Sequence, residues 1–400
     1  MSSPGVPETS VLAIASHVAY GYVGNTMATF VMQSLGCEVT AINTVHYSNH
    51  TGYKQFKGRK ATADEILDLY AGLAQSGLND AFDVLLSGYI PSADAVAAVG
   101  KIARDLRLLG ARRPGGFFWV LDPVMGDQGR LYVPKACVPA YKALLPSADL
   151  ILPNQFEAEL LSDTKITDLS SLARAVHVLH RVHGVPHVVI TSLRLDHTST
   201  YKTTDAEPGE EKKEEEEEEA QQQTLTIIGS TSTTSHKPRL FRIDVPAYPI
   251  FFSGTGDMFA ALAVARLREA VAEAGLLRVR SWKSGDEVRS GEGLPLARAC
   301  ERVCASMGAV LGKTAVGVRG WEGREGERGG GGGGKGDGDN GEGEGVERAR
   351  HLARTRAAEV KVVRNVEDLR VPPGVERFRA RAVDVDVDFD ADVGVGGGQG

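Results

Sequence analysis

The sequence predicts an α/β protein built on a mostly parallel sheet, and two observations support this prediction. Between residues 11 and 192, short apolar runs alternate with longer amphipathic segments, the pattern of parallel strands joined by helices. Several of these apolar runs end directly in polar or glycine-containing turns. Because ligands of open α/β sheets bind beyond the carboxyl ends of the strands, we expect these turns to converge on one site.

The predicted strands are short and strongly apolar. They are 11–16, 38–45, 83–89, 117–123, 150–153 and 187–192. Apolar residues at helical spacing predict helices at 63–75, 93–109 and 169–183. Folded sequence is expected to resume at 240–249 and to continue into a helix that begins near Gly256.

The sequence predicts one interrupted domain over residues 11–383, preceded by a flexible N-terminus at 1–10 and followed by a disordered tail at 384–400. A run of six glutamates inside 196–238 predicts an acidic, disordered insertion, because repelling charges without apolar residues cannot offset the entropy of ordering. The glycine run inside 322–346 predicts a flexible linker.

The composition narrows the possible partners and the compartment. The chain has 400 residues and a formal charge of −7, and it shows no basic stripe, which argues against a nucleic-acid partner. It has no apolar run of about 20 residues and no basic, apolar leader, so we expect no membrane partner. Its four scattered cysteines suit a reduced, cytoplasmic compartment, and Cys300 and Cys304 are spaced for packing on one helix.

The sharpest motif is Gly254-Thr255-Gly256-Asp257, which is followed at once by an apolar helical stretch. Glycines at a helix start allow an anion to approach the free N–H groups and the positive end of the helix dipole. Asp257 is placed to accept a proton from a substrate hydroxyl as that oxygen attacks a γ-phosphate. The alternative is a tight turn in which Asp257 only caps the helix.

Two further motifs place carboxylates after apolar strands. Asp122 and Asp127 belong to DPVMGD and suit Mg²⁺, directly or through its waters, although a solvated turn is the alternative. Asn154 and Glu157 belong to PNQFEAELL, near the start of the next helix. There the carboxylate either favours the helix dipole or faces a metal held by phosphates.

Three other segments carry hydrogen-bonding groups. Thr191 and Ser192 follow a strand and either contact phosphate or merely end the strand. Residues 16–25 offer glycines for close approach and aromatic rings for a flat ligand, and residues 48–53 are dense in polar groups.

Six motifs, in their order along the chain, resemble those of pyridoxal kinases of the ribokinase-like superfamily. They are ASHVAYGYVGN, YSNHTGY, DPVMGD, PNQFEAELL, VVITS and GTGDMFAA. The resemblance runs over 11–195 and 241–267 and returns at 360–383. It implies a three-layer α-β-α fold with a mostly parallel central sheet flanked by helices, and a homodimer. The implied activity is transfer of the γ-phosphoryl group of ATP to the 5′-hydroxymethyl group of pyridoxal, pyridoxine or pyridoxamine, giving pyridoxal 5′-phosphate from pyridoxal.

The resemblance also implies a role for each matching residue. Asp257 is implied as the general base, and the anion hole as Gly254, Thr255 and Gly256. The implied substrate-binding residues are Ser16, Val23, Tyr47, Thr51 and Tyr89. The implied ATP and phosphate ligands are Asp127, Asn154, Thr191 and Ser192. The implied ligands of Mg²⁺, or of another divalent cation, are Asp122, Asp127 and Glu157, with K⁺ as a nearby monovalent cation.

Two other functions are compatible with these motifs. One is a kinase of the same superfamily that acts on hydroxymethylpyrimidine or on a sugar-like alcohol. The other is a non-catalytic vitamin-binding or scaffold protein whose acidic segment recruits a partner.

Overall fold

A computed structural model describes residues 5–193, 224–329, 340–385 and 387. The strands are β1 (Ser10–Tyr20), β2 (Glu38–Asn49), β3 (Gly58–Lys60), β4 (Val84–Ser87), β5 (Phe118–Leu121), β6 (Gly126–Asp127), β7 (Arg130–Leu131), β8 (Leu150–Ile151), β9 (His187–Leu193), β10 (Thr224–Ser232), β11 (Pro238–Pro246) and β12 (Arg381–Ala382). The α-helices are α1 (Gly24–Ser34), α2 (Ala63–Gln75), α3 (Ala93–Gly110), α4 (Cys137–Leu144), α5 (Gln155–Ser162), α6 (Leu169–Arg181), α8 (Thr255–Glu273), α9 (Pro295–Gly329), α10 (Asn340–Ala357) and α11 (Val366–Arg370). A short 3₁₀ turn, η1, spans Thr51–Tyr53.

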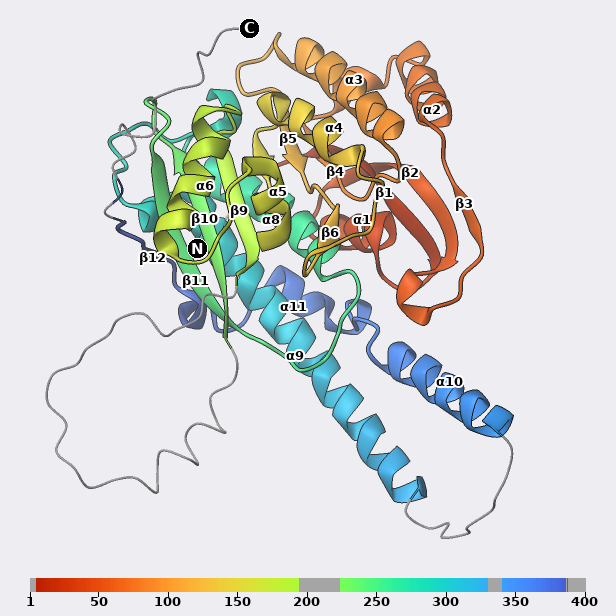
Figure 1. Ribbon diagram of the computed structural model, residues 1–400. Helices are drawn as coiled ribbons and strands as arrows, with labels where there is room; N and C mark the ends of the chain where they lie inside the picture. The colour runs from red at the N-terminus through yellow and green to blue at the C-terminus, as the bar shows by residue number, and fades with distance from the viewer. Residues whose placement is uncertain (1–4, 194–223, 330–339, 386, 388–400) are drawn as a thin grey trace, which may run out of the picture.

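A ten-stranded sheet runs through the molecule in the order β12-β11-β10-β9-β8-β5-β4-β1-β2-β3 (Figure 1). Its centre is parallel, from β2 through β1, β4, β5 and β8 to β9. Antiparallel strands extend it at both sides, with β3 next to β2 and β10, β11 and β12 beyond β9. The carboxyl ends of the six parallel strands therefore share one edge of the sheet.

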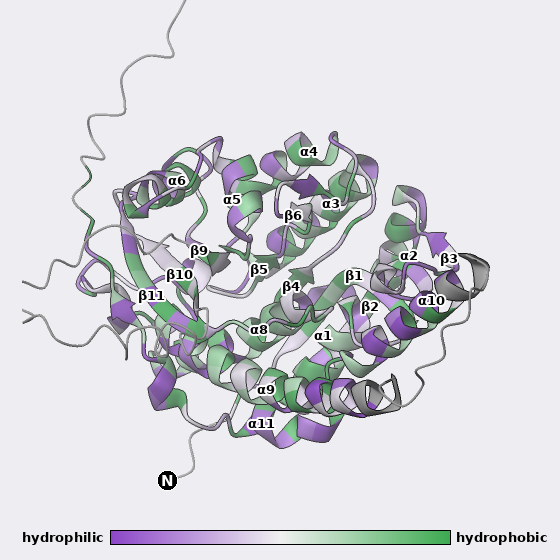
Figure 2. Cartoon of the chain, turned by 60° about the horizontal axis from the view of Figure 1, so that its bottom comes forward, coloured by the Kyte–Doolittle hydropathy of each residue, from purple (hydrophilic) through white to green (hydrophobic). Residues whose placement is uncertain are grey.

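Helices cover both faces of the sheet, as three-layer packing requires. Val11 and Ala13 of β1 belong to the core under α1, α8 and α9, whereas Leu12 and Ile14 belong to the core under α2 to α6. This alternation follows from the period of two in a strand. Figure 2 shows the apolar sides of the helices turned toward the sheet on both faces. The predicted three-layer α-β-α fold with a mostly parallel sheet is confirmed.

The expected disordered insertion at 196–238 is wrong in its second part. Residues 224–232 form β10, which pairs with β9 on one side and β11 on the other. The β-branched run TLTIIGSTS suits a strand that is buried between two neighbours. Gly229 allows Phe241 of β11 to pack closely, since a Cβ atom at this position would lie 2.1 Å from the ring. The acidic run itself falls outside the described residues.

The glycine-rich linker predicted at 322–346 is wrong at both ends, because α9 continues to Gly329 and α10 begins at Asn340. The two helices pack on each other, and an ion pair joins Arg354 Nε to Glu322 Oε1 at 3.0 Å. Packing against α9 supplies contacts that a glycine-rich sequence read in isolation does not reveal.

The chain ends also differ from the prediction. Thr9, expected in a flexible N-terminus, is buried, and its carbonyl accepts a hydrogen bond from the Glu38 amide at 2.9 Å. At the other end, Val385 and Val387 pack against the core, while most of the predicted tail at 384–400 lies outside the described residues. Cys300 and Cys304 lie one turn apart on α9 and are buried, as predicted.

Within the described ranges, no helix combines the length and the apolarity that crossing a bilayer requires.

Asp149 is a buried carboxylate, 2% exposed, that fastens several elements of the fold. It accepts hydrogen bonds from Arg107 of α3 at 2.5 Å, from the Trp119 amide of β5 at 2.8 Å and from the Ser281 hydroxyl at 2.6 Å. We expect Asp149→Ala to lower the free energy of unfolding by about 2 kcal/mol or more, because it leaves buried donors without an acceptor. Urea unfolding followed by circular dichroism measures this loss.

The matched control is Glu322→Ala, which removes a more exposed carboxylate from an ion pair. It is expected to change stability by less than about 1 kcal/mol. Equal effects of the two substitutions would show that Asp149 does not have this structural role.

Candidate active site

The turn at the start of α8 is built on a glycine that no other residue could replace without strain. Gly254 is the N-cap of α8 and has a left-handed backbone, with φ of 82°. A Cβ atom at this position would lie 2.1 Å from the carbonyl oxygen of Tyr22. The GTGD turn is thus packed directly against the glycine-containing loop that joins β1 to α1.

Asp257 lies in the first turn of α8 and is only partly exposed. Its carboxylate accepts a hydrogen bond from the amide of Gly24, the first residue of α1. Gly24 has φ of 53°, and a Cβ atom there would lie 2.0 Å from the Ser16 carbonyl oxygen. A Cβ atom at Gly88, after β4, would lie 3.8 Å from Asp257 Oδ1. Asp257 therefore sits where the ends of β1 and β4 meet the starts of α1 and α8.

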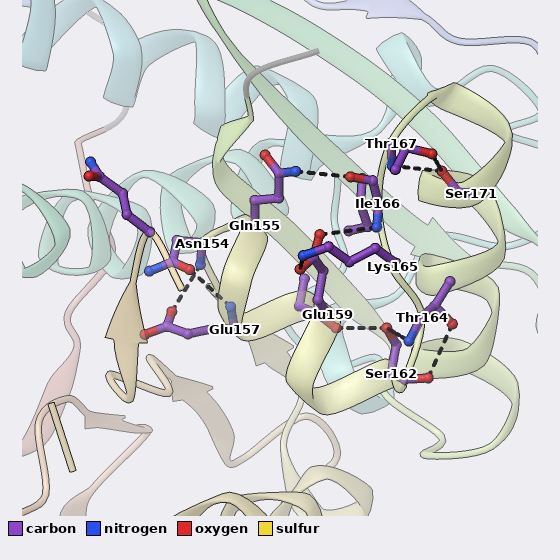
Figure 3. Close-up of polar contacts among 12 residues, drawn as sticks. Asn154, Gln155, Glu157, Glu159, Ser162, Thr164, Lys165, Ile166, Thr167 and Ser171 are labelled. Atoms are coloured by element: carbon purple, nitrogen blue, oxygen red, sulfur yellow. Dashed lines mark hydrogen bonds and ion pairs between the residues drawn. The ribbon is translucent and has the colours of Figure 1, made fainter. Parts of the chain in front are cut away.

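Glu157 joins the turn after β5 to the start of α5. Its side chain accepts hydrogen bonds from the amides of Met125 at 2.8 Å, Gly126 at 3.3 Å and Asn154 at 2.9 Å. Asn154 in return caps α5 by accepting from the Glu157 amide at 2.9 Å, as Figure 3 shows. This reciprocal capping box buries Glu157 beside the DPVMGD turn.

Asp122 completes a group of three carboxylates with Glu157 and Asp257. It follows β5 and is 6% exposed, and a Cβ atom at Gly256 would lie 3.9 Å from its Oδ2. Burial, together with repulsion from Glu157 and Asp257, raises the pKa of Asp122 well above its ordinary value. The three residues are called the carboxylate cluster below.

The other two members of the carboxylate cluster are also difficult to ionise. Burial raises the pKa of Glu157 to about 7, although three backbone N–H groups favour its charged form. Burial likewise raises the pKa of Asp257 to about 6 against the opposing hydrogen bond from Gly24. Among the residues that the structure describes, no Lys, Arg or His forms an ion pair with any of the three.

The carboxylate cluster fits a divalent cation that is shared with phosphate oxygens. In the described ranges, no group of three or more His, Cys, Asp or Glu side chains is arranged to hold a metal ion by itself. Mg²⁺ does not need such a cage, because proteins usually bind it through one or two carboxylates, waters and substrate phosphates. Buried carboxylates without a cationic partner are consistent with that mode of binding.

The predicted phosphate ligands lie along the same edge of the sheet. Thr191, near the end of β9, donates its amide to the Pro153 carbonyl at 3.0 Å, which brings it beside Asn154. Ser192 follows it and is partly exposed. Asp127 lies on the β6–β7 hairpin, and its charge contributes to the raised pKa of Glu157.

The residues predicted to bind the substrate lie on the other side of Asp257. Ser16 lies next to Gly24, and Val23 is the N-cap of α1. A Cβ atom at Gly254 would lie 3.2 Å from the Cγ1 atom of Val23. Tyr47 of β2 packs on Phe56 with 4.7 Å between ring centroids. Burial raises the pKa of Tyr89, and the nearby phenol of Tyr47 contributes to this rise.

Thr51 begins the η1 turn and is exposed. The Nδ1 atom of its neighbour His50 lies 3.2 Å from the hydroxyl oxygen of Ser253. Ser253 directly precedes the GTGD turn. The structure thus places the YSNHTGY segment next to the start of α8.

Two further acidic residues have contacts that the sequence did not predict. Glu159, also in PNQFEAELL, turns away from the carboxylate cluster and binds Lys165 Nζ at 2.5 Å and the Ile166 amide at 3.1 Å (Figure 3). Glu359 was missed, and it binds His50 at 3.0 Å and Tyr53 at 2.9 Å. No spacing in the sequence signals this contact, because Glu359 lies far along the chain and outside every motif.

Comparison with known proteins agrees with this geometry. A family profile described as phosphomethylpyrimidine kinase matches residues 87–237. Human pyridoxal kinase is 38% identical over 267 residues, which are 64% of this chain and 77% of the human protein. The pyridoxal kinase of Dictyostelium discoideum is 36% identical over 260 residues, 64% of this chain and 77% of that protein.

A solved structure extends the similarity to nearly the whole chain. The pyridoxal kinase of Leishmania donovani, in complex with ADP and pyridoxamine, has a TM-score of 0.67 and 28% sequence identity. The match covers 94% of this chain and 99% of that chain. The fold and the comparisons define an enzyme of the kinase class with a ribokinase-like fold. Within that class, the chain belongs to the pyridoxal kinase family.

We expect Asp122→Asn to raise the melting temperature of the metal-free protein at about pH 8.5 and to reduce the further rise that Mg²⁺ produces. At this pH the unfolded chain ionises Asp122 freely, whereas in the folded chain burial and two other carboxylates oppose its charge, which destabilises the fold. The amide removes this unfavourable charge and also removes one predicted ligand for Mg²⁺. Calorimetric melting in EDTA and then in excess Mg²⁺ measures both effects.

The pH provides the internal control for this substitution. A carboxyl whose pKa is raised by folding loses its proton at a lower pH in the unfolded chain than in the folded chain. The free energy of unfolding therefore falls as pH rises from the unfolded pKa to the folded pKa. Because this loss of stability begins at the unfolded pKa of about 4, the difference in melting temperature between the two proteins should be smaller at about pH 5 than at about pH 8.5. A variant that melts lower than the wild type in EDTA at high pH would contradict the repulsion.

Proposed function

We propose that this chain transfers the γ-phosphoryl group of ATP to the 5′-hydroxymethyl group of pyridoxal, pyridoxine or pyridoxamine. The observation that carries the proposal is the position of Asp257, at the start of α8 and beside Asp122, in a chain of the pyridoxal kinase family. The product formed from pyridoxal would be pyridoxal 5′-phosphate, the salvaged form of the vitamin.

Asp257 is proposed as the general base for the substrate hydroxyl. A pKa raised by burial to about 6 leaves its carboxylate ionised at neutral pH and makes it a stronger base than an ordinary aspartate. The Gly24 amide orients this carboxylate through its hydrogen bond. The proton of the hydroxyl can therefore move to Asp257 as the oxygen attacks phosphorus.

The amides of Gly254, Thr255 and Gly256 are proposed to stabilise the charge on the phosphoryl group in transfer. They lie at the N-terminus of a long helix, where free N–H groups and the helix dipole favour an anion. The close packing of Gly254 on Tyr22 fixes the direction of these groups before substrate binds.

A bound Mg²⁺ ion would neutralise the phosphate oxygens and polarise the bond to the γ-phosphorus. Asp122, Asp127 and Glu157 are the residues proposed to hold it, directly or through water. Asn154, Thr191 and Ser192 are proposed to bind the phosphates, and Asp127 would contribute there too. K⁺ is proposed nearby on the resemblance alone. Leu152, which directly precedes Pro153 and Asn154, is buried and has no side-chain oxygen that could bind this ion.

The substrate ring is proposed to lie on the other side of Asp257. Tyr47 and Tyr89 present aromatic faces, and Val23 presents an apolar surface, which suit a flat heteroaromatic ring. The hydroxyls of Ser16 and Thr51 are proposed to bind the polar groups of that ring.

The resemblance further supports a homodimer, and the four scattered cysteines support a cytoplasmic location; we include both in the proposal. Light scattering on the purified protein tests the first part, and imaging of the tagged protein tests the second.

One rival substrate class is favoured by a specific observation, the match of residues 87–237 to a phosphomethylpyrimidine kinase profile. We expect pyridoxal to have a kcat/KM at least about tenfold above that of hydroxymethylpyrimidine or a sugar alcohol, because the aromatic side chains of Tyr47 and Tyr89 are proposed to bind a pyridine ring. ADP release measured over a panel of these alcohols tests the order. A higher kcat/KM for hydroxymethylpyrimidine would replace the proposed substrate.

Asp257→Asn is expected to lower kcat by about 10²–10⁴-fold, because the amide cannot accept the hydroxyl proton. Its affinity for ATP should stay near the wild-type value, since the side chain keeps its size. Its melting temperature should not fall, since the amide also loses a charge that repels Asp122. Coupled measurement of ADP release and calorimetric titration of ATP separate these quantities. The exposed Asp68→Asn on α2 is the matched control, and a wild-type kcat in Asp257→Asn would remove Asp257 from the mechanism.

A further inference from the structure

Glu359 is a buried carboxylate, 8% exposed, in the segment that follows α10. It accepts a hydrogen bond from the Tyr53 hydroxyl at 2.9 Å, lies 3.0 Å from His50 Nε2, and accepts another from the amide of Tyr22. All three partners belong to the two motif segments that adjoin the GTGD turn.

The hydrogen bonds around His50 identify which ring nitrogen carries the proton. The Gly52 amide points at Nδ1 from 3.2 Å, so Nδ1 must be the acceptor, and the Ser253 hydroxyl lies 3.2 Å from the same atom. The proton is therefore on Nε2, which donates it to Glu359. A continuous chain of hydrogen bonds runs from Glu359 through His50 to the residue that precedes Gly254.

Glu359 also fixes the glycine loop between β1 and α1. A Cβ atom at Gly21 would lie 2.8 Å from both carboxylate oxygens, so the backbone of this loop rests on the side chain. The amide of the next residue, Tyr22, donates a hydrogen bond to Glu359. The carbonyl oxygen of Tyr22 is the atom against which Gly254 packs. One carboxylate thus contacts the loop on which the anion-binding turn is built.

The charge of Glu359 is maintained by these contacts. Burial opposes ionisation, but the hydrogen bonds from His50, Tyr53 and Tyr22 outweigh it and hold the pKa of Glu359 below its ordinary value. Burial and the Glu359 carboxylate raise the pKa of Tyr53, so its hydroxyl stays a donor. A second group holds the same turn, since His351 of α10 donates to the Gly52 carbonyl at 3.0 Å.

We propose that Glu359 is a positioning residue that holds the η1 turn and the 21–24 loop in register with the start of α8. Thr51 lies between His50 and Gly52, two residues that this network fixes, so Glu359 controls where the Thr51 hydroxyl points. The effect on the reaction rests on the proposed function, whereas the effect on the η1 turn does not.

The first test is steady-state kinetics of Glu359→Ala and Glu359→Gln with pyridoxal and ATP. We expect Glu359→Ala to raise the KM for pyridoxal by about tenfold or more and to change the KM for ATP by less than about twofold. Glu359→Gln should lie within about threefold of the wild type, because its amide oxygen can still accept one of the hydrogen bonds. Glu367→Ala is the matched control, since this carboxylate is on the same segment but 74% exposed.

The second test is hydrogen exchange of the free protein, which needs no activity. In Glu359→Ala, amides of residues 48–54 should exchange faster, while those of α3 on the opposite face of the sheet should not change. If the wild type fails to phosphorylate pyridoxal, the proposed function fails and this exchange result still tests the positioning role. Should Glu359→Ala not fold, Tyr53→Phe carries both measurements, because it removes one hydrogen bond to Glu359 and keeps the ring.

Two outcomes would overturn the proposal. Wild-type KM values together with wild-type exchange at 48–54 in Glu359→Ala would show that the η1 turn does not depend on Glu359. Faster exchange throughout α3 and β1, with a loss of kcat and no change in the KM for pyridoxal, would assign Glu359 a general stabilising role instead.

Discussion

Repulsion of Asp122 by Glu157 and Asp257 is the constraint on which the rest of the site depends. Three carboxyl groups share a buried region, and in the described part of the chain no cationic side chain pairs with them. A fold selected only for stability would not retain such a group, since each ionisation there lowers stability. In the proposed function a divalent cation and a phosphate chain would offset this repulsion, which would link the folding of the sheet edge to phosphoryl transfer.

The sheet imposes this arrangement through its topology. Parallel strands end at one edge, and Asp122 and Asn154 follow two adjacent strands, β5 and β8. Glycines then allow the starts of two helices to approach closely. Gly24 brings an amide to Asp257, and Gly254 permits α8 to begin against the loop before α1. The proposed base and the proposed anion-binding amides are consequently fixed by backbone packing rather than by flexible side chains.

Much of the fold and the motif positions could be predicted from the sequence, because periodicity reports burial and each motif directly follows a strand. Strand β10 was not predicted, since the neighbouring acidic run dominated the composition of that stretch. Helices α9 and α10 extend into glycine-rich sequence because they pack on each other. Glu359 could not be predicted at all, because its partners His50 and Tyr53 are distant in sequence and their contact exists only after folding.

The most direct test of the central claim is calorimetric titration of the metal-free protein with Mg²⁺ at about pH 6.5, in two buffers that differ in ionisation enthalpy. Because the pKa of Glu157 is raised to about 7, this carboxyl should hold a proton at pH 6.5 that the cation displaces, and the raised pKa of Asp122 acts in the same direction. The account predicts a buffer-dependent enthalpy that corresponds to release of protons on binding. Binding of Mg²⁺ with the same enthalpy in both buffers would contradict it.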